Sequence, residues 1–387
     1  MSNLAFNKTM KLPPHIAYSQ GLRSHIQYNL SNSCAQSMTL AELMKLSDQD
    51  STGLSLEYAE VQGDAMLRRE IAHFHRRLNH TPNSEMRFDF DEYNVLTFCG
   101  AQEALAAVYQ SVLLPGDEVV VFTPCYPSLI SMAESMGVTV KAIALDEHNF
   151  WHIDVEELEA AINEKTKIVV INSPHNPTGS VVETGLAKKI LALVEKYQCY
   201  LIADDVAQAS NFNHLALAHD YLHYRNTVVI SVMSKSFGLG GVRVGWALTQ
   251  NKDLLETMLV AKSYGSICCS AVDEMLALIA LDNAEEILSR NNQIILDNIN
   301  QFQQFIDINS DDFAWHPPKA GTMAIVGSKL ATPCRDWLPM LAKEEGVLLL
   351  PASLFGLDGE YFRLGLGQKN MPEALAALQT FLVRHSL

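Results

Sequence analysis

Short apolar runs alternate with amphipathic stretches through the middle of the 387-residue chain. Apolar runs rich in Val and Ile are typical of buried strands, and they occur at 94–98, 118–122, 167–171, 200–203 and 227–232. Between them, apolar residues recur at helical spacing at 101–114, 128–136 and 185–197. This alternation predicts an α/β fold in which helices sandwich a mostly parallel central sheet.

The pattern changes beyond residue 254. Stretches at 273–280 and 285–305 predict helices, and the last region mixes short strands at 323–326, 347–350 and 361–366 with helices at 336–344 and 372–384. We therefore expect a smaller α+β C-terminal domain over 286–387. A large domain is expected over 46–285, preceded by an N-terminal arm over 1–45.

Composition narrows the classes of partner. The formal net charge of −16 argues against nucleic acid or an anionic membrane surface. No apolar run is long enough to span a bilayer, and the N-terminus lacks a signal-peptide pattern. The seven cysteines are scattered without metal-ligand spacing, which predicts no metal site and reduced thiols in a cytoplasmic protein.

The stretch from Ser231 to Trp246 carries the strongest chemical signal. Lys235 lies between Ser234 and Ser236, ahead of a glycine-rich turn and Arg243. A free lysine titrates near 10, but burial or a neighbouring cation lets its amine form a Schiff base. Hydroxyls, backbone N–H groups and a guanidinium suit a phosphate monoester. The combination predicts pyridoxal phosphate (PLP), the alternative being a solvated lysine on a glycine-rich loop.

Other matched groups follow other predicted strands. Ala101 and Gln102 open a helix whose N–H groups suit a phosphate, and Asn176 lies in a rigid loop that can aim its amide at a ring substituent. Asp204 ends a buried strand, where a carboxylate needs a cation such as a pyridinium nitrogen. Each group alone also fits a plain turn, a helix cap or a salt bridge. Because ligands bind at the carboxyl ends of such strands, the coincidence of four groups favours a PLP site.

Two motifs carry a family resemblance. The segment Asn-Pro-Thr-Gly at 176–179 and the Lys235 stretch with Gly238, Gly241, Arg243 and Gly245 resemble the aspartate aminotransferase fold family of PLP enzymes, the class I/II aminotransferases. The resemblance runs from 29–34 to 362–367, nearly the whole chain. It implies the aspartate aminotransferase-like architecture, with 46–285 as the PLP-binding domain.

The resemblance also implies roles for single residues. Lys235 would hold PLP as a Schiff base and shuttle the α-proton, Asp204 would pair with the ring nitrogen, and Asn176 would donate to the phenolic oxygen. Tyr126 would stack on the ring. The phosphate would be held by Ala101, Gln102, Ser234 and Arg243.

Further implied residues lie on the substrate side and at a subunit boundary. Arg363 would clamp the substrate α-carboxylate, and Ser33 and Cys34 would face the substrate together with Asn176. Tyr58 resembles a tyrosine that reaches the phosphate of a neighbouring subunit, which implies a homodimer. His15 and His25 fit surface or packing roles as well as catalytic ones, and residues near Tyr18, His25 and Tyr264 are expected to influence substrate choice.

One position departs from the family pattern. The usual Asp-Glu-Val-Tyr is Asp-Asp-Val-Ala at 204–207. Ala207 cannot supply the tyrosine hydroxyl that donates to the phenolic oxygen. We expect the Schiff base to stay protonated to higher pH than in a typical aminotransferase. A low Schiff-base pKa in a spectrophotometric titration would contradict this expectation.

The leading function is therefore an aminotransferase that exchanges the amino group of an L-amino acid with a 2-oxo acid. The alternative is PLP-dependent elimination and cyclisation of a hydroxylated arginine, because 29–46 resembles the branch near capreomycidine synthase. A PLP-binding transcription regulator would need a basic DNA-binding domain ahead of the first motif. Dinucleotide binding through the glycines at 238–241 is not favoured, because their spacing differs from that of a dinucleotide-binding motif. No second arginine stands where it could hold a side-chain carboxylate, so a dicarboxylic amino donor is not favoured.

Overall fold

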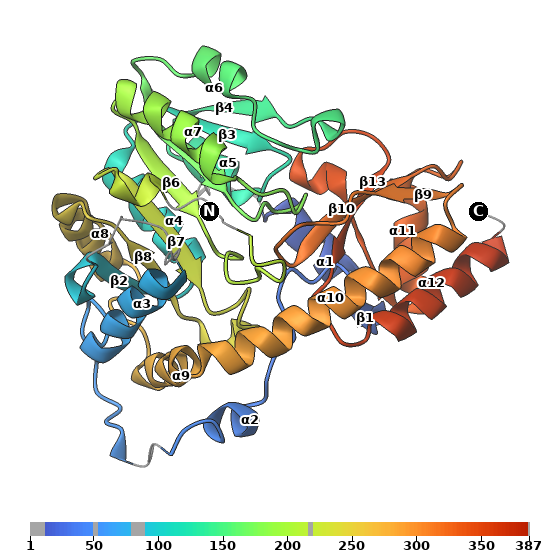
Figure 1. Cartoon of the computed structure of the whole chain (residues 1–387), viewed down its shortest axis with the longest axis horizontal. Coiled ribbons are helices and arrows are strands. Elements are labelled where there is room, and N and C mark those ends of the chain that lie inside the picture. The colour runs from blue at the N-terminus through green and yellow to red at the C-terminus, as the bar shows by residue number, and fades with distance from the viewer. Residues whose placement is uncertain (1–11, 49–52, 79–89, 216–219, 386–387) are drawn as a thin grey trace, which may run out of the picture.

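A computed structural model describes residues 12–48, 53–78, 90–215 and 220–385. Tyr58 and the other predicted site residues all fall within these ranges, while most of the N-terminal stretch before α1 lies outside them. Figure 1 shows two units side by side, the larger one built around a twisted sheet and the smaller one around a second sheet.

The larger unit contains a seven-stranded sheet. Its strand order is β2 (Val95–Phe98), β8 (Gly245–Leu248), β7 (Thr227–Val232), β6 (Tyr200–Asp204), β5 (Thr166–Asn172), β3 (Glu118–Thr123) and β4 (Thr139–Ala144). Only β8 runs antiparallel to its neighbours. The predicted fold class, an α/β protein with a mostly parallel central sheet, is confirmed.

Successive residues of each strand pack on opposite faces of this sheet. In β3, Val119 and Val121 join the hydrophobic core on one face, and Val120 and Phe122 join the core on the other. Side chains alternate across a strand, so a continuous apolar run is what burial on both faces requires. One face is covered by α4 (Ala101–Val112), α5 (Ser128–Ser135) and α8 (Lys252–Tyr264). The other is covered by α3 (Ala65–Leu78), α6 (Val155–Ala161), α7 (Thr184–Lys196) and α9 (Ala271–Asp282).

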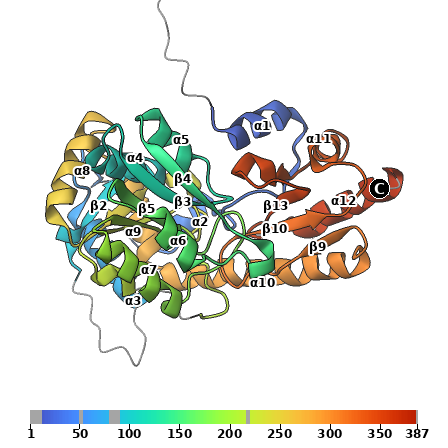
Figure 2. The same cartoon turned by 90° about the horizontal axis from the view of Figure 1, so that it is seen from above.

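The smaller unit is built on a four-stranded antiparallel sheet. Its order is β12 (Leu350–Pro351), β13 (Tyr361–Gly365), β10 (Met323–Ser328) and β9 (Phe313–Trp315). A separate core joins this sheet to α11 (Cys334–Glu345) and α12 (Met371–His385), which Figure 2 shows at the end of the molecule away from the large sheet. The α+β character expected of the C-terminal region is present.

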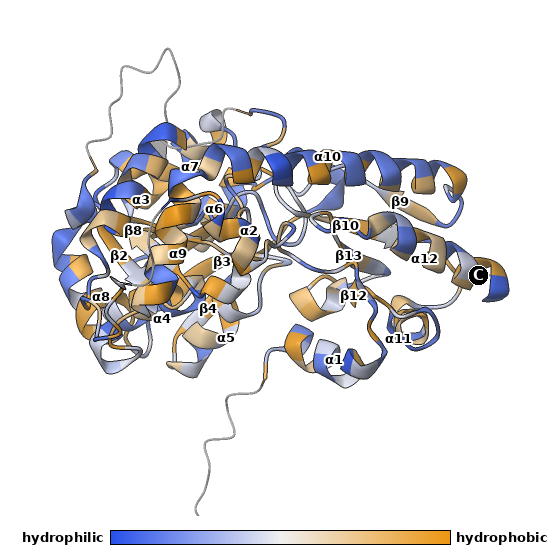
Figure 3. Ribbon diagram, turned by 90° about the horizontal axis from the view of Figure 1, so that it is seen from below, coloured by the Kyte–Doolittle hydropathy of each residue, from blue (hydrophilic) through white to orange (hydrophobic). Residues whose placement is uncertain are grey.

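Helix α10 (Ala284–Ile308) connects the two units. Its first turns contribute Ala284 and Ile287 to the core of the large sheet, and its later turns contribute Ile295 and Phe302 to the core of the small sheet. Figure 3 shows hydrophilic and hydrophobic residues alternating along it, as expected of a helix that buries one side. The domain boundary expected at 285 falls in its first turn and stays a prediction. Within the described residues, no helix combines the length and apolarity needed to cross a bilayer.

The N-terminal region contacts both units, with its first helix on the smaller one and its second on the larger one. It contains α1 (Pro14–Leu22), β1 (Tyr28–Asn29), which pairs with β11 (Val347–Leu348), and α2 (Leu40–Met44). Short 3₁₀ turns complete the chain: η1 (Arg23–His25), η3 (Glu92–Asn94), η4 (Glu147–Asn149), η5 (Asp220–His223), η6 (Gly240–Val242) and η7 (Ala352–Phe355).

Candidate active site

A cavity of about 200 Å³, partly open to solvent, lies at the carboxyl ends of the central strands. Eight of the predicted site residues line it: Ala101, Gln102, Tyr126, Asn176, Asp204, Ser234, Lys235 and Arg243. They arrive from separate strands. Because β5, β6 and β7 are parallel neighbours, the residues that follow them meet at one edge of the sheet.

The lysine amine lies next to a serine from the N-terminal region. Lys235 Nζ donates to Ser33 Oγ at 2.6 Å, and the backbone N–H of Ala35 donates to the Lys235 carbonyl at 2.9 Å. Burial lowers the pKa of the Lys235 amine, and the Arg363 guanidinium lowers it further, against the opposing effects of Cys34 and Asp204. The amine is thereby shifted toward the neutral form that attacks a carbonyl.

The two adjacent aspartates have different surroundings. Asp204 lines the cavity and accepts a long hydrogen bond from the Val206 backbone N–H at 3.4 Å. Burial raises the pKa of its carboxyl to about 6. Asp205 is buried and accepts from the Tyr221 hydroxyl at 2.9 Å on both oxygens. The Asp204 carboxylate is therefore the one available to a cation in the cavity.

Arg363 on β13 brings the smaller unit to the site. Its Nη1 donates to Asn176 Oδ1 at 3.4 Å, its Nη2 donates to the Ser31 carbonyl at 2.7 Å, and its guanidinium lies 4.5 Å from the centroid of the Phe355 ring. Burial lowers its pKa to about 10. No ion pair joins it to a carboxylate within the described part of the chain. A buried guanidinium that has no carboxylate partner is suited to bind the carboxylate of a ligand.

The start of α4 forms the opposite end of the cavity. Gly100 has φ of +100° and precedes the helix without a side-chain cap, which leaves the first backbone N–H groups available to an anion. Arg243 packs beside it and donates to the Cys99 carbonyl at 3.0 Å. A Cβ at Gly245 would lie 2.6 Å from the Ala101 nitrogen. Glycine is thus needed for the Lys235 loop to approach the helix.

Four predicted site residues do not line this cavity: Arg363, which is described above, Tyr58, Ser33 and Cys34. Tyr58 is 86% exposed and lies in a surface hollow formed with Leu56 and Val272, outside the cavity. Ser33 contacts Lys235 and Cys34 is half-buried next to it, without lining the cavity wall. Ala207 does line the cavity and is 3% exposed, so it offers a methyl group there.

Some neighbours of the site carry no signal in the sequence. The His15 ring lies 5.4 Å from that of Tyr126, and Phe355 packs between His15 and Arg363. Ser31 accepts from Arg363 across 332 positions. By contrast, His25 is exposed and Tyr264 is 90% exposed, outside the cavity.

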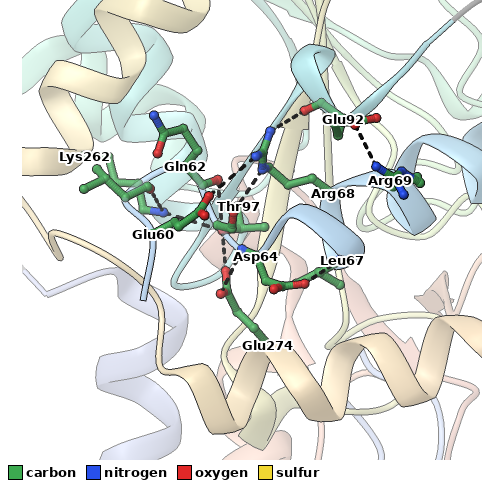
Figure 4. A network of polar contacts seen from close by, with 12 residues as sticks. Glu60, Gln62, Asp64, Leu67, Arg68, Arg69, Glu92, Thr97, Lys262 and Glu274 are labelled. Atoms are coloured by element: carbon green, nitrogen blue, oxygen red, sulfur yellow. Dashed lines mark hydrogen bonds and ion pairs between the residues drawn. The ribbon is translucent and has the colours of Figure 1, made fainter. Parts of the chain in front are cut away.

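A polar network fixes the segment that carries Tyr58 (Figure 4). Glu274 accepts from the Asp64 backbone N–H at 3.1 Å and from Thr97 Oγ1 at 2.7 Å. Lys262 donates to the Val61 carbonyl and to Thr97, and Arg68 Nε donates to the Gly63 carbonyl at 3.0 Å. Lys262 and Glu274 are 1% and 2% exposed. Buried charges with full sets of partners hold a segment in one position.

The donor set of the cavity fits PLP. A carboxylate suits the ring nitrogen, an amide suits a ring oxygen, and a helix N-terminus with an arginine suits the phosphate. A lysine amine lies among them. A family model described as "Aminotransferase class I and II" matches residues 26–378. The chain belongs to this family. The predicted family, PLP cofactor and transferase class are confirmed.

Individual relatives of this aminotransferase span two kinds of enzyme. This chain is 28% identical to capreomycidine synthase of Streptomyces vinaceus, over 76% of this chain and 75% of that protein. It is 30% identical to the arginine–pyruvate transaminase AruH of Pseudomonas aeruginosa over 80% of this chain and 77% of that protein. A PLP-dependent aminotransferase from Streptococcus suis superposes with a TM-score of 0.88 at 26% identity, covering 97% of this chain and 99% of that one.

Proposed function

We propose that this protein transfers the amino group of an L-amino acid to a 2-oxo acid, using Lys235 as the proton-transfer residue. The observation that carries the proposal is the meeting of Lys235, Asp204 and Asn176 at one cavity, with Arg363 of the smaller sheet hydrogen-bonded to Asn176. A lysine amine and a guanidinium near the same amide suit an α-amino acid, since its carboxylate and its α-carbon must be held at once.

Each residue has a defined task in this proposal. Arg363 binds the α-carboxylate with its planar fork and fixes the orientation of the α-carbon. Bound PLP supplies an electron-withdrawing ring to the substrate nitrogen. Asp204 keeps a proton on the ring nitrogen, because a buried carboxylate is stabilised by a cation. Lys235 Nζ would remove the α-proton and return it on the far side of the substrate nitrogen, and its lowered pKa favours the base form.

Ser33 has a positioning task beside the lysine. Its hydroxyl accepts from Lys235 Nζ at 2.6 Å, while its own carbonyl accepts from Thr322 Oγ1 at 2.8 Å. The serine is thereby fixed to the smaller unit, and it directs the lysine amine toward the substrate side of the cavity.

The decisive experiment follows the fate of the amino group. Purified protein loaded with PLP is mixed with a panel of L-amino acids, and 2-oxo acid release is measured together with conversion of the cofactor to its amine form. We expect both, with 2-oxo acid acceptors regenerating the starting form. Lys235→Ala should abolish turnover, and exposed Lys189→Ala should not change it.

A second candidate is elimination and cyclisation. Two observations favour it: the 28% identity to capreomycidine synthase and the absence of a hydroxyl at Ala207. Its product pattern differs, because PLP is retained while ammonia, water or a ring product is released. That outcome in the same panel would replace the aminotransferase proposal.

We further propose a cytoplasmic homodimer. Exposed apolar side chains gather around Tyr58, including Leu56 at 83% and Val272 at 37% exposure. An exposed apolar patch of this kind marks an interface, and a second copy would cover Tyr58. All seven cysteines are free, which supports a reducing compartment.

A further inference from the structure

Strand β13 contacts the larger unit through a second residue besides Arg363. Along this strand, Phe362 and Leu364 belong to the core of the smaller unit, whereas Tyr361 packs against the core of the larger one. Because side chains alternate across a strand, Tyr361 and Arg363 lie on the same face of the small sheet. Ile325, which pairs with Arg363 on β10, also joins the core of the larger unit. This face of the small sheet is therefore the one that meets the larger unit.

The guanidinium of Arg363 has its short contacts outside the large sheet. It donates to the Ser31 carbonyl at 2.7 Å and lies 4.5 Å from the centroid of the Phe355 ring. Its contact with Asn176 of the larger unit is long, at 3.4 Å, where a normal hydrogen bond of this kind is about 2.7–3.2 Å. The distance between the guanidinium and the cavity therefore depends on how β13 lies on the larger unit.

Tyr361 makes a short polar contact between the two units. Its hydroxyl donates to Glu147 Oε2 at 2.5 Å, and its ring meets the Trp151 ring edge-on, with the centroids 6.2 Å apart. The hydrogen bond to Glu147, together with burial, raises the pKa of Tyr361 to about 12, so the hydroxyl stays a donor at neutral pH. Glu147 Oε1 lies 4.0 Å from Nε2 of His316, which follows β9. One carboxylate of the larger unit thus lies between two side chains of the smaller one.

The segment that carries Glu147 is fixed within the larger unit. Asp146 Oδ1 accepts from the His148 backbone N–H at 2.9 Å, and the Asp146 carbonyl accepts from the Trp151 backbone N–H at 2.8 Å. Phe150 and Trp151 have φ of +52° and +59°, in the left-handed region that is uncommon for residues other than glycine. Trp151 is 5% exposed, in the core of the larger unit. Packing of its ring holds this uncommon backbone, which gives Glu147 a defined position.

We infer that Tyr361 is a positioning residue, which holds Arg363 at the α-carboxylate through its hydrogen bond to Glu147. Tyr361 stands two residues before Arg363 on the same face of one strand, so a displacement of one side chain displaces the other. The inference rests on the proposed function, because it uses the assigned binding of the α-carboxylate to Arg363.

The test measures carboxylate recognition apart from turnover. Aminooxyacetate and O-methylhydroxylamine both react with the Schiff base of the PLP-loaded enzyme: the aminooxy nitrogen takes the place of the Lys235 nitrogen on the PLP carbon, and the free lysine amine is released. Only aminooxyacetate carries a carboxylate. The ratio of the two second-order rate constants, measured by absorbance, is the carboxylate preference of the enzyme.

Tyr361→Phe keeps the ring and removes the hydroxyl. We expect it to lower the carboxylate preference about fivefold or more, because a hydrogen bond to a charged group is lost. The rate constant for O-methylhydroxylamine and the dissociation constant of PLP should each stay within about twofold, which a general loss of structure would not allow. Arg363→Ala should abolish the preference.

Further variants assign the effect to the hydrogen bond. Glu147→Ala should reproduce the loss, and the double variant with Tyr361→Phe should lose no more than either single one, because both remove the same bond. Glu147→Gln retains an acceptor and should keep part of the preference. Tyr224→Phe is the matched control: it removes a hydroxyl that donates to the Cys199 carbonyl at 2.8 Å within the larger unit, and the preference should not change.

The inference is overturned if Tyr361→Phe and Glu147→Ala keep the wild-type preference, if both reagents slow equally, or if the two losses add. If Tyr361→Phe does not fold, Glu147→Ala and Glu147→Gln still decide. A preference that survives Arg363→Ala would contradict the assigned carboxylate site and the inference with it. Release of ammonia or a ring product from ordinary amino acids would contradict transamination alone and would leave this comparison unchanged.

Discussion

At the scale of single residues, the contrast between Asp204 and Asp205 shows how position decides chemistry. Neighbours on a strand point to opposite faces, so one carboxylate enters the cavity and the other meets Tyr221 in the core. Asp204 has a raised pKa because the fold buries it before any cation arrives. The buried position of Asp204 therefore suits a cationic ligand but lowers the stability of the PLP-free protein.

This cost gives a pH-dependent prediction. The carboxyl has a pKa near 4 in the unfolded chain and about 6 in the fold, so the folded state binds the proton more tightly. Stability of the PLP-free protein should fall as pH rises from about 4 to about 6 and stay lowered above. We expect PLP-free Asp204→Asn to exceed PLP-free wild type in unfolding free energy at pH 8 by about 1–3 kcal/mol. The measurement is thermal unfolding by circular dichroism.

Two comparisons make that result specific. The difference should vanish at pH 4, and added PLP should reverse the order, because wild type alone then gains a carboxylate–cation pair. Asp253→Asn, at an exposed side chain, should show no such pattern. A less stable PLP-free Asp204→Asn at pH 8 would contradict the burial argument.

Sequence patterns identify residues that line the cavity but not their neighbours from distant segments. Lys235, Asp204 and Asn176 each follow an apolar run, and the carboxyl ends of parallel strands are known to meet. His15, Ser31 and Phe355 reach the site through the packing of distant segments. No local pattern marks such residues, since their contacts depend on the tertiary fold.

At the scale of elements, the loop between β7 and β8 approaches the start of α4 so closely that only glycine fits. We expect Gly245→Ala to weaken PLP binding by about tenfold or more, because the added methyl would displace the Ala101 backbone. Gly241→Ala is the matched control, since a Cβ there has no atom within 4 Å. PLP dissociation constants from absorbance titration compare the two, and equal affinities would show that the phosphate end tolerates the shift.

The network beneath the Tyr58 segment gives a second element-scale prediction. Lys262→Met leaves Glu274 and the Val61 carbonyl without a buried cation, so we expect a loss of about 3–5 kcal/mol in unfolding free energy. Lys252→Met, at an exposed position of the same helix, should change it by less than about 0.5 kcal/mol. Urea unfolding measures both. Similar losses in the two variants would exclude a special role for the buried amine.

Strands were predictable where burial is continuous and less so elsewhere. The runs that became β3, β5, β6 and β7 are apolar on both faces. Strand β4 was missed because it lies at the sheet edge, where Ile143 is its one buried residue and the apolar run is broken. Strand β8 was missed because four residues directly after the Lys235 loop carry too short a pattern.

At the scale of the whole molecule, the proposed homodimer would use the exposed Tyr58 to complete the site of a second copy. We expect Tyr58→Ala and Lys235→Ala, each inactive or impaired alone, to regain about one quarter of wild-type activity when unfolded together and refolded at equal amounts. Half of the dimers would be mixed, and each would contain one intact site. Activity of the mixture no higher than the sum of the parents would contradict a shared site.

The segment from Leu30 to Gln36 has a consequence for how the chain folds. Besides short-range bonds, it contacts the Lys235 carbonyl, Arg290, Thr322, Gly365 and Gln368, all at least 200 positions further along. Contacts at such separation close very long loops and form late. During synthesis this segment leaves the ribosome before the residues that it contacts and must wait for them. Assembly of the candidate active site is thus expected to be a late step of folding.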